Sequence, residues 1–245
     1  LKGSQSALYG SEAIGGVIQI FTRKGSSALT PFFTVGGGRY ETLTTSAGLS
    51  GGGKRSWFNA SISSNETNGF DSRNSSGSSD SDGYHNLSGS LRAGYRFTNN
   101  LELDAHLLHA DNDNDYDGSF TNESEGIQQV VGSGLRFSPT DRWLLTLVGG
   151  RSRDESDNFK DGTFRSQFET ERDSLSWQND ITLGTAHLLT LGADHQKDSV
   201  DGPTAYAVTS RDNDGLFVQY QGAFQHHDLK LSLRNDDNEQ FGQHT

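Results

Sequence analysis

The residues best suited to chemistry in this sequence are aspartates that gather in two segments rich in Ser, Asn and Gly. The two groups are Asp71, Asp80 and Asp82, and then Asp111, Asp113, Asp115 and Asp117. Carboxylate oxygens on loops suit Ca²⁺, which accepts about six to eight oxygen ligands in loose geometry. The same acids would also serve as a solvated loop surface. The pattern therefore predicts either calcium shared between adjacent loops or a solvated acidic surface.

Other kinds of site chemistry find little support. Residues 113–118 resemble the start of an EF-hand loop, but Ser124 stands where that loop needs Glu. The pair His226 and His227 falls in an expected short turn, where a surface pair is a simpler interpretation than a metal site. Acid pairs such as Asp154 and Glu155 have no apolar pocket beside them to raise a pKa. We predict that the protein is not an enzyme and that it carries no organic cofactor.

Composition points to many short strands. The chain has 245 residues, of which 31% are hydrophobic, with a mean hydropathy of −0.70 and 30 glycines. An aromatic content of 10% argues against disorder. No run of about 18 apolar residues is present, so a membrane-spanning helix is not available and a β-barrel is the remaining membrane architecture. The net charge of −12, without clustered Lys and Arg, argues against a nucleic-acid partner.

Apolar and polar residues alternate with a period of two in several segments. In residues 87–97, Leu87, Leu91 and Tyr95 alternate with Ser88 and Arg92. The same pattern recurs in residues 101–107, 175–177, 216–224 and 229–234. Such alternation predicts strands with one apolar face. We therefore expect an all-β protein.

Short and long connections alternate along the chain. Short turns are expected near residues 51–54, 98–100, 138–141, 184–186 and 225–228, and long polar loops near 64–84, 112–126, 154–171 and 199–213. Aromatic residues flank the short turns, as in the interfacial girdle of an outer-membrane barrel. A soluble sandwich with core aromatics is the alternative. About eleven strands would be about half of a 22-stranded antiparallel up-and-down transmembrane β-barrel.

Residues 1–24 carry the most specific motif. Gly-Gly enters an apolar run at Val17, and no Gly-Lys-Ser/Thr follows, which argues against a phosphate loop. The segment resembles the closing part of the plug domain of TonB-dependent outer-membrane receptors. The resemblance implies that residues 1–25 end a plug and that residues 30–245 are the N-terminal part of its barrel. The matching positions include Ser6, Ala7, Tyr9, Gly10, Ala13, Ile14, Gly15 and Gly16.

Further segments resemble the cobalamin (vitamin B12) transporters within these receptors, namely residues 68–71, 80–84, 115–117 and 234–242. The resemblance implies calcium bound by Asp71, Asp80, Asp82 and Asp117, and a ligand contact at Tyr116. The loop between Asp71 and Asp80 is shorter than in that family.

The resemblance implies an active importer in the outer membrane of a Gram-negative bacterium, in contact with outer-membrane lipid. Its substrate would be cobalamin or a related corrinoid, and TonB would supply energy through a segment that precedes Leu1. A siderophore receptor is the alternative within transport. A passive porin or an adhesin is a further alternative, but neither has a use for the plug-like residues.

Overall fold

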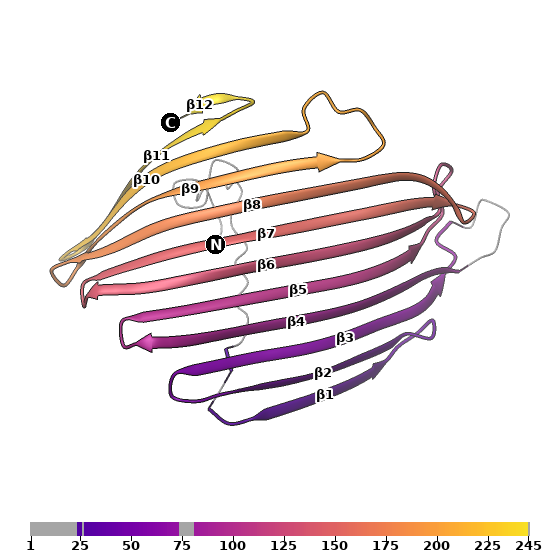
Figure 1. The fold of residues 1–245 in the computed structure, drawn as a ribbon, viewed down its shortest axis with the longest axis horizontal. Helices are drawn as coiled ribbons and strands as arrows, with labels where there is room; N and C mark the ends of the chain where they lie inside the picture. The colour runs from indigo at the N-terminus through magenta and orange to yellow at the C-terminus, as the bar shows by residue number, and fades with distance from the viewer. Residues whose placement is uncertain (1–23, 26, 74–80, 245) are drawn as a thin grey trace.

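The computed structural model describes residues 24–25, 27–73 and 81–244, and arranges them as one curved antiparallel sheet (Figure 1). In this described part, twelve strands lie side by side in the order in which they follow along the chain. The all-β, up-and-down prediction is confirmed, and the sheet does not close into a barrel within this chain. The strands are β1 (Thr30–Gly37), β2 (Leu43–Gly52), β3 (Ser56–Phe70), β4 (Asp82–Thr98), β5 (Leu101–Asp115), β6 (Glu123–Thr140), β7 (Trp143–Lys160), β8 (Thr163–Leu183), β9 (His187–Asp201), β10 (Ser210–Phe224), β11 (His227–Asn238) and β12 (Gly242–His244).

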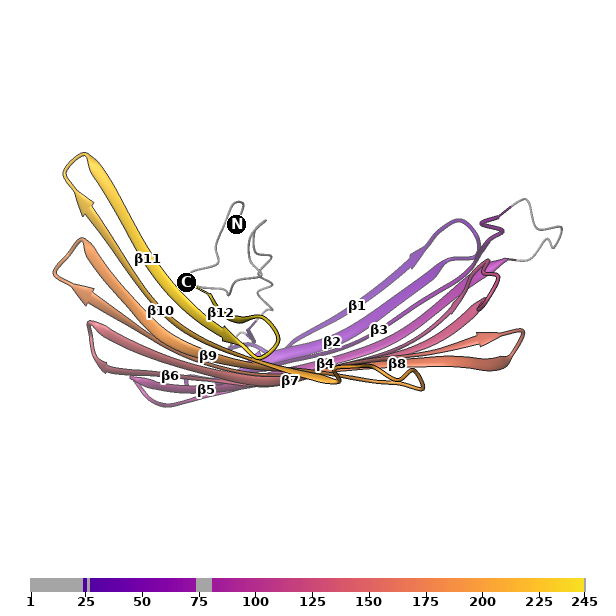
Figure 2. The ribbon, with the colours of Figure 1, turned by 90° about the horizontal axis from the view of Figure 1, so that it is seen from above.

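The sheet bends into a trough (Figure 2). Its concave face is polar and its convex face is largely apolar. Leu91 is 47% exposed, whereas Asp104, which pairs with Gly94 on the opposite face, is 4% exposed. Side chains inside a curve crowd one another, while those outside it spread apart. The buried polar side chains therefore mark the concave face, and the exposed leucines mark the convex face.

The two ends of the strands differ in their connections. At the end nearest residues 99–100, which we call the inner end, β4 and β5, β6 and β7, and β10 and β11 are joined by two-residue turns. At the other, outer end, residues 71–81, 116–122 and 202–209 form longer connections. The short and long connections thus alternate as predicted at these places.

The prediction of one long loop is wrong. Residues 154–171 form no long loop, because β7 continues to Lys160, β8 begins at Thr163, and only Asp161 and Gly162 turn the chain. Both turn residues have positive φ, of 50° and 70°, as tight hairpin turns require. The strands extend further than hydrophobic alternation indicated, because this outer part is polar on both faces.

The convex face carries an apolar band that ends at a row of charges. On β7, Trp143, Leu145 and Leu147 lie on this face, and Arg151 follows; its guanidinium pairs with Asp173 of β8 at 2.6 Å. About 9–11 residues of a tilted strand span a bilayer. β7 and β8 have 18 and 21 residues, so their outer parts extend beyond the band. No helix of the described residues is long and apolar enough to cross a membrane.

Glycines on the concave face make room for large side chains of neighbouring strands. A Cβ at Gly94 would lie 2.4 Å from the Trp57 ring, and a Cβ at Gly215 would lie 2.0 Å from Nη2 of Arg234. At Gly215 the Arg234 side chain crosses from β11 over β10 to β9, where Nη2 lies 2.7 Å from Oδ1 of Asp194. These glycines therefore let side chains lie flat across the sheet, which explains part of the high glycine content.

Candidate ligand-binding site

A pocket of about 660 Å³ opens on the concave face near the outer end of the strands. One line of register partners crosses its floor, from Val130 on β6 through Ser152 and Arg172 to Asp198 and Arg211 on β9 and β10. Val208, from the β9–β10 connection, and Gln240, from the β11–β12 turn, contribute to its rim. The pocket floor thus depends on five neighbouring strands, β6 to β10, holding one register.

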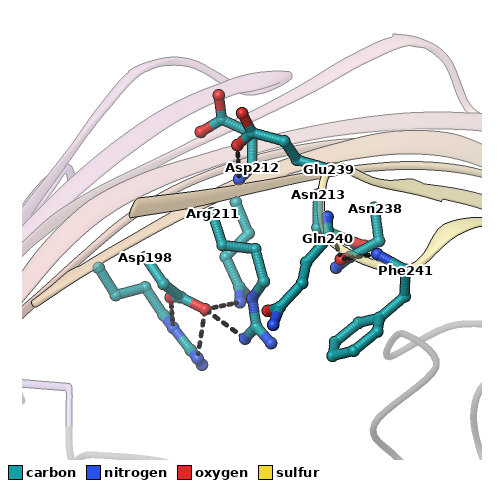
Figure 3. Close-up of polar contacts among 10 residues, drawn as sticks. Asp198, Arg211, Asp212, Asn213, Asn238, Glu239, Gln240 and Phe241 are labelled. Atoms are coloured by element: carbon teal, nitrogen blue, oxygen red, sulfur yellow. Dashed lines mark hydrogen bonds and ion pairs between the residues drawn. The ribbon is translucent and has the colours of Figure 1, made fainter. Parts of the chain in front are cut away.

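Two arginines share one carboxylate in this floor (Figure 3). Nε of Arg172 donates to Oδ1 of Asp198 at 2.6 Å, and Nη2 of Arg211 donates to Oδ2 at 2.8 Å. Gln196 Nε2 adds a hydrogen bond to Oδ2 at 3.1 Å. The cluster holds three side chains from three strands in fixed positions.

The Asp198 carboxylate stays ionised despite partial burial. Asp198 lies beside the charged row of the convex face and so outside the membrane-spanning part of β9. Burial, the largest single influence, acts to raise the pKa of Asp198, but the hydrogen bonds from Arg172 and Arg211 together outweigh it and hold the pKa below its ordinary value. The side chain is 22% exposed, so the pair is only partly screened by water.

Charges of opposite sign balance around the pocket. The charged side chains that face it are two arginines and two acids, together with amides, hydroxyls and apolar side chains. Gln128 Nε2 donates to Asp154 at 2.9 Å, which fixes a further polar group on the β6–β7 side. These charged residues are Arg172 and Arg211, and Asp154 and Asp198, whereas the side chains of Arg153 and Glu171, which also border the pocket, lie on the convex face. Such a surface can hold a large polar molecule of little net charge through many hydrogen bonds.

The segment at residues 234–242 that resembles the cobalamin transporters folds partly into the β11–β12 turn (Figure 3). Oδ1 of Asn238 accepts hydrogen bonds from the backbone N–H groups of Gln240 and Phe241, at 3.1 and 3.2 Å. Glu239 and Asp212 bond to each other through backbone and side chain, at 3.0 and 3.2 Å. These bonds hold the turn against the start of β10 and place Gln240 on the pocket.

The aspartates expected to hold calcium come together only in part. The backbone N–H of Ser72 donates to Oδ2 of Asp82 at 2.7 Å, and Ser72 Oγ lies 3.4 Å from Oδ2 of Asp117. Asp71 accepts a hydrogen bond from the backbone of Arg73, and Asp80 lies outside the described residues. The β3–β4 and β5–β6 connections therefore meet at Ser72. Among the residues that the structure describes, no group of three or more His, Cys, Asp or Glu is placed to hold a metal ion.

The expected ligand contact, Tyr116, lies in the β5–β6 connection. Its hydroxyl donates to Thr121 Oγ1 at 2.6 Å, and its backbone N–H donates to the carbonyl of Asn122 at 2.9 Å. In this structure the ring therefore stabilises its own loop. Tyr116 is not part of the pocket lining described above.

The plug motif lies outside the described residues, so its expected role stays a prediction. Its members are Ser6, Ala7, Tyr9, Gly10, Ala13, Ile14, Gly15 and Gly16.

Sequence reasoning missed the Arg172–Asp198–Arg211 cluster. Arg172 and Asp198 are neighbours only because β8 and β9 pair in one particular register. The available signal was a basic residue on one strand, an acid on the next strand and a basic residue on the strand after that, all at positions of the same face. That signal becomes readable only once the turns between the strands are fixed.

Known proteins resemble the chain along its whole length. No protein-family model matches it. It is 28% identical over 247 residues to the vitamin B12 transporter BtuB of Photobacterium profundum, covering 99% of this chain and 41% of that protein. It is 26% identical over 266 residues to the vitamin B12 transporter BtuB of Vibrio cholerae serotype O1, covering 100% and 42%. The chain thus spans about two fifths of the length of these curated relatives.

Solved structures share the fold. The siderophore receptor PirA of Pseudomonas aeruginosa superposes with a TM-score of 0.79 at 21% identity, over 100% of this chain and 44% of that one. The copper transporter OprC superposes with a TM-score of 0.74 at 15% identity, over 97% and 41%. The predicted receptor-barrel fold is therefore confirmed.

The predicted resemblance to TonB-dependent outer-membrane receptors is also confirmed, as is the location in the outer membrane of a Gram-negative bacterium. The similar proteins are transporters and receptors, not enzymes, which agrees with the prediction that this chain is not an enzyme.

Proposed function

We propose that this chain, which resembles TonB-dependent outer-membrane receptors over its whole length, forms part of the wall of a receptor that imports cobalamin or a related corrinoid into the periplasm. TonB would supply the energy, and the convex apolar band would contact outer-membrane lipid. The observation that carries the proposal is the similarity to vitamin B12 transporters across 99% of the chain.

The balanced pocket supports this substrate class over an iron chelate. A corrinoid presents many amides and little net charge, so it matches a lining in which arginines and acids are equal in number. Ferric siderophores are commonly anionic, and a pocket for them would gain from an excess of arginine. The siderophore receptor remains the second candidate, because solved siderophore receptors share the fold.

Calcium belongs to the same proposal. Ser72 brings Asp82 and Asp117 from two separate connections to one place, and both supply hard oxygen donors of the kind that Ca²⁺ prefers. With Asp71 and Asp80 these carboxylates would hold the ion and fix the two connections against each other. Ordering of these connections would then strengthen substrate binding at the outer end.

Titration of the full-length parent receptor in detergent tests the proposal. Cyanocobalamin and a ferric catecholate siderophore are added separately, each with Ca²⁺ and with a chelator. Tight cobalamin binding that calcium strengthens would support both assignments. Cobalamin binding of equal strength with and without Ca²⁺ would contradict only the calcium assignment. Binding of the siderophore alone would contradict cobalamin as the substrate and favour the siderophore receptor.

A further inference from the structure

The chain enters the barrel at Lys24 and Gly25, which lie against the inner end of the concave wall. The Lys24 ammonium is 2.8 Å from Oε1 of Glu102 on β5 and 5.1 Å from the centroid of the Trp57 ring on β3. A Cβ at Gly25 would lie 2.2 Å from the carbonyl oxygens of Gly51 and Phe58. The backbone at Gly25 therefore rests directly on the β2–β3 pair, where no larger residue fits.

The wall under Lys24 is built from charges that hold one another. Glu102 is also 3.1 Å from Arg96 and 3.6 Å from Arg136. Arg136 continues to Asp104 at 3.1 Å. Oδ1 of Asp104 also lies 2.9 Å from Arg92. Such a network fixes its members more firmly than a single surface pair does.

The Trp57 ring is fixed as well. It lies over Gly94, whose missing side chain leaves the space for it, and the Arg92 guanidinium is 5.3 Å from its centroid. A cation over an indole face gains electrostatic attraction. Lys24 thus meets a carboxylate and an aromatic face that are both held in place before it arrives.

We propose that this wall permanently anchors the segment by which the chain enters the barrel. Lys24 and Gly25 then stay in contact with β2, β3 and β5 while substrate passes, and we call this contact the seat. The seat is formed at the inner end, away from the pocket at the outer end, so filling the pocket does not require the seat to open. The role during passage rests on the proposed function, whereas the seat itself does not.

Hydrogen–deuterium exchange on the full-length receptor in detergent tests the seat. Backbone amides of residues 24, 25 and 27–29 are expected to exchange slowly, both without ligand and with cyanocobalamin. Lys24→Met is expected to speed their exchange about fivefold, because the ion pair with Glu102 and the contact with the Trp57 ring are lost. The matched control is Lys54→Met, an exposed lysine in the β2–β3 turn at the same end of the sheet. Equal exchange in Lys24→Met and the parent protein would overturn the proposal.

Cross-linking tests whether the seat stays closed during passage. The chain has no cysteine, so Lys24→Cys with Glu102→Cys can be joined by a short bis-maleimide, with Arg96→Cys and Glu102→Cys as a control pair within the wall. Uptake of cobalamin by cells is expected to stay within about twofold after either cross-link. Uptake lost only with the Lys24 cross-link, with cobalamin binding retained, would overturn the anchor. An absence of cobalamin binding and uptake in the unmodified receptor would instead contradict the proposed substrate, and exchange would still decide on the seat.

Discussion

At the scale of single residues, the concave wall twice places one carboxylate between two arginines. Asp198 lies between Arg172 and Arg211 at the pocket, and Asp104 lies between its own pair of arginines near the inner end. One acid between two bases fixes both guanidinium groups, each of which carries five N–H donors. At the pocket, Arg172 and Arg211 both belong to the surface that a ligand would meet.

Asp198→Asn is expected to weaken cobalamin binding by about tenfold or more, because a hydrogen bond to a charged group contributes roughly 1.5–3 kcal/mol and both arginines lose their fixed position. The matched control is Asp173→Asn, which breaks a similar pair with Arg151 at the same level on the convex face. Titration of the purified full-length receptors measures both. Equal loss in the two variants would show that the pocket cluster has no special part in binding.

Low pH is expected to reduce the contribution of Asp198 to the stability of the folded receptor. The folded-state pKa of Asp198 is held below its ordinary value. Its contribution to stability is therefore fully present above the unfolded value of about 3.9 and is lost as the pH falls through the lower, folded value. Thermal unfolding of the receptor between pH 7 and 3 should show a smaller acid decline in Asp198→Asn than in the parent. An identical decline in both proteins would mean that another group governs the loss of stability at low pH.

At the scale of strands, the sequence predicted well what depends on local periodicity. Residues 87–97 alternate strictly, and β4 runs through them. The outer parts of β7 and β8 were expected to be a loop, because a strand outside the membrane is polar on both faces and loses its periodic signal while the backbone ladder continues. The pocket cluster was not predictable for a different reason: register between strands is set by turns and packing, not by local pattern.

The edge of the apolar band can be mapped with single arginines. Leu147→Arg places a charge within the band on β7 and is expected to destabilise the receptor by about 2–4 kcal/mol. Ile127→Arg, on the same face but paired with Glu155 beyond the charged row, is expected to cost about 0–1 kcal/mol. Thermal unfolding in lipid vesicles measures the difference. Similar losses at both positions would place the membrane boundary further out than the Arg151 row.

Gly215 tests how strongly three strands depend on one side chain. Gly215→Ala pushes a Cβ into Arg234, whose Nε also donates to Asp236 at 2.8 Å, so buried charges are left without partners. A loss of about 3–5 kcal/mol is expected. Gly89→Ala is the control, because its nearest neighbour, the Ser61 carbonyl oxygen, would be 3.9 Å away. Equal unfolding temperatures for the two variants would show that Arg234 relocates without cost.

At the scale of the whole molecule, the open sheet is the dominant feature. β1 and β12 each pair on one side only in the described structure, and the convex face carries exposed leucines, valines and aromatic residues. Unpaired edges and apolar bands favour association.

The 245-residue chain by itself is therefore expected to aggregate in water and to need detergent or strands that pair with its open edges. Light scattering after removal of detergent measures this. A monodisperse monomer in plain buffer would contradict it.

The neighbour-by-neighbour strand order also shapes how such a wall can be built. Each strand of the described sheet from β2 to β11 pairs with the strand before it and the strand after it in the chain, so no pairing has to wait for a distant segment. Closing each hairpin carries only the small entropy cost of a short loop. The sheet can therefore form one hairpin at a time, with each new strand pairing to the edge strand already in place.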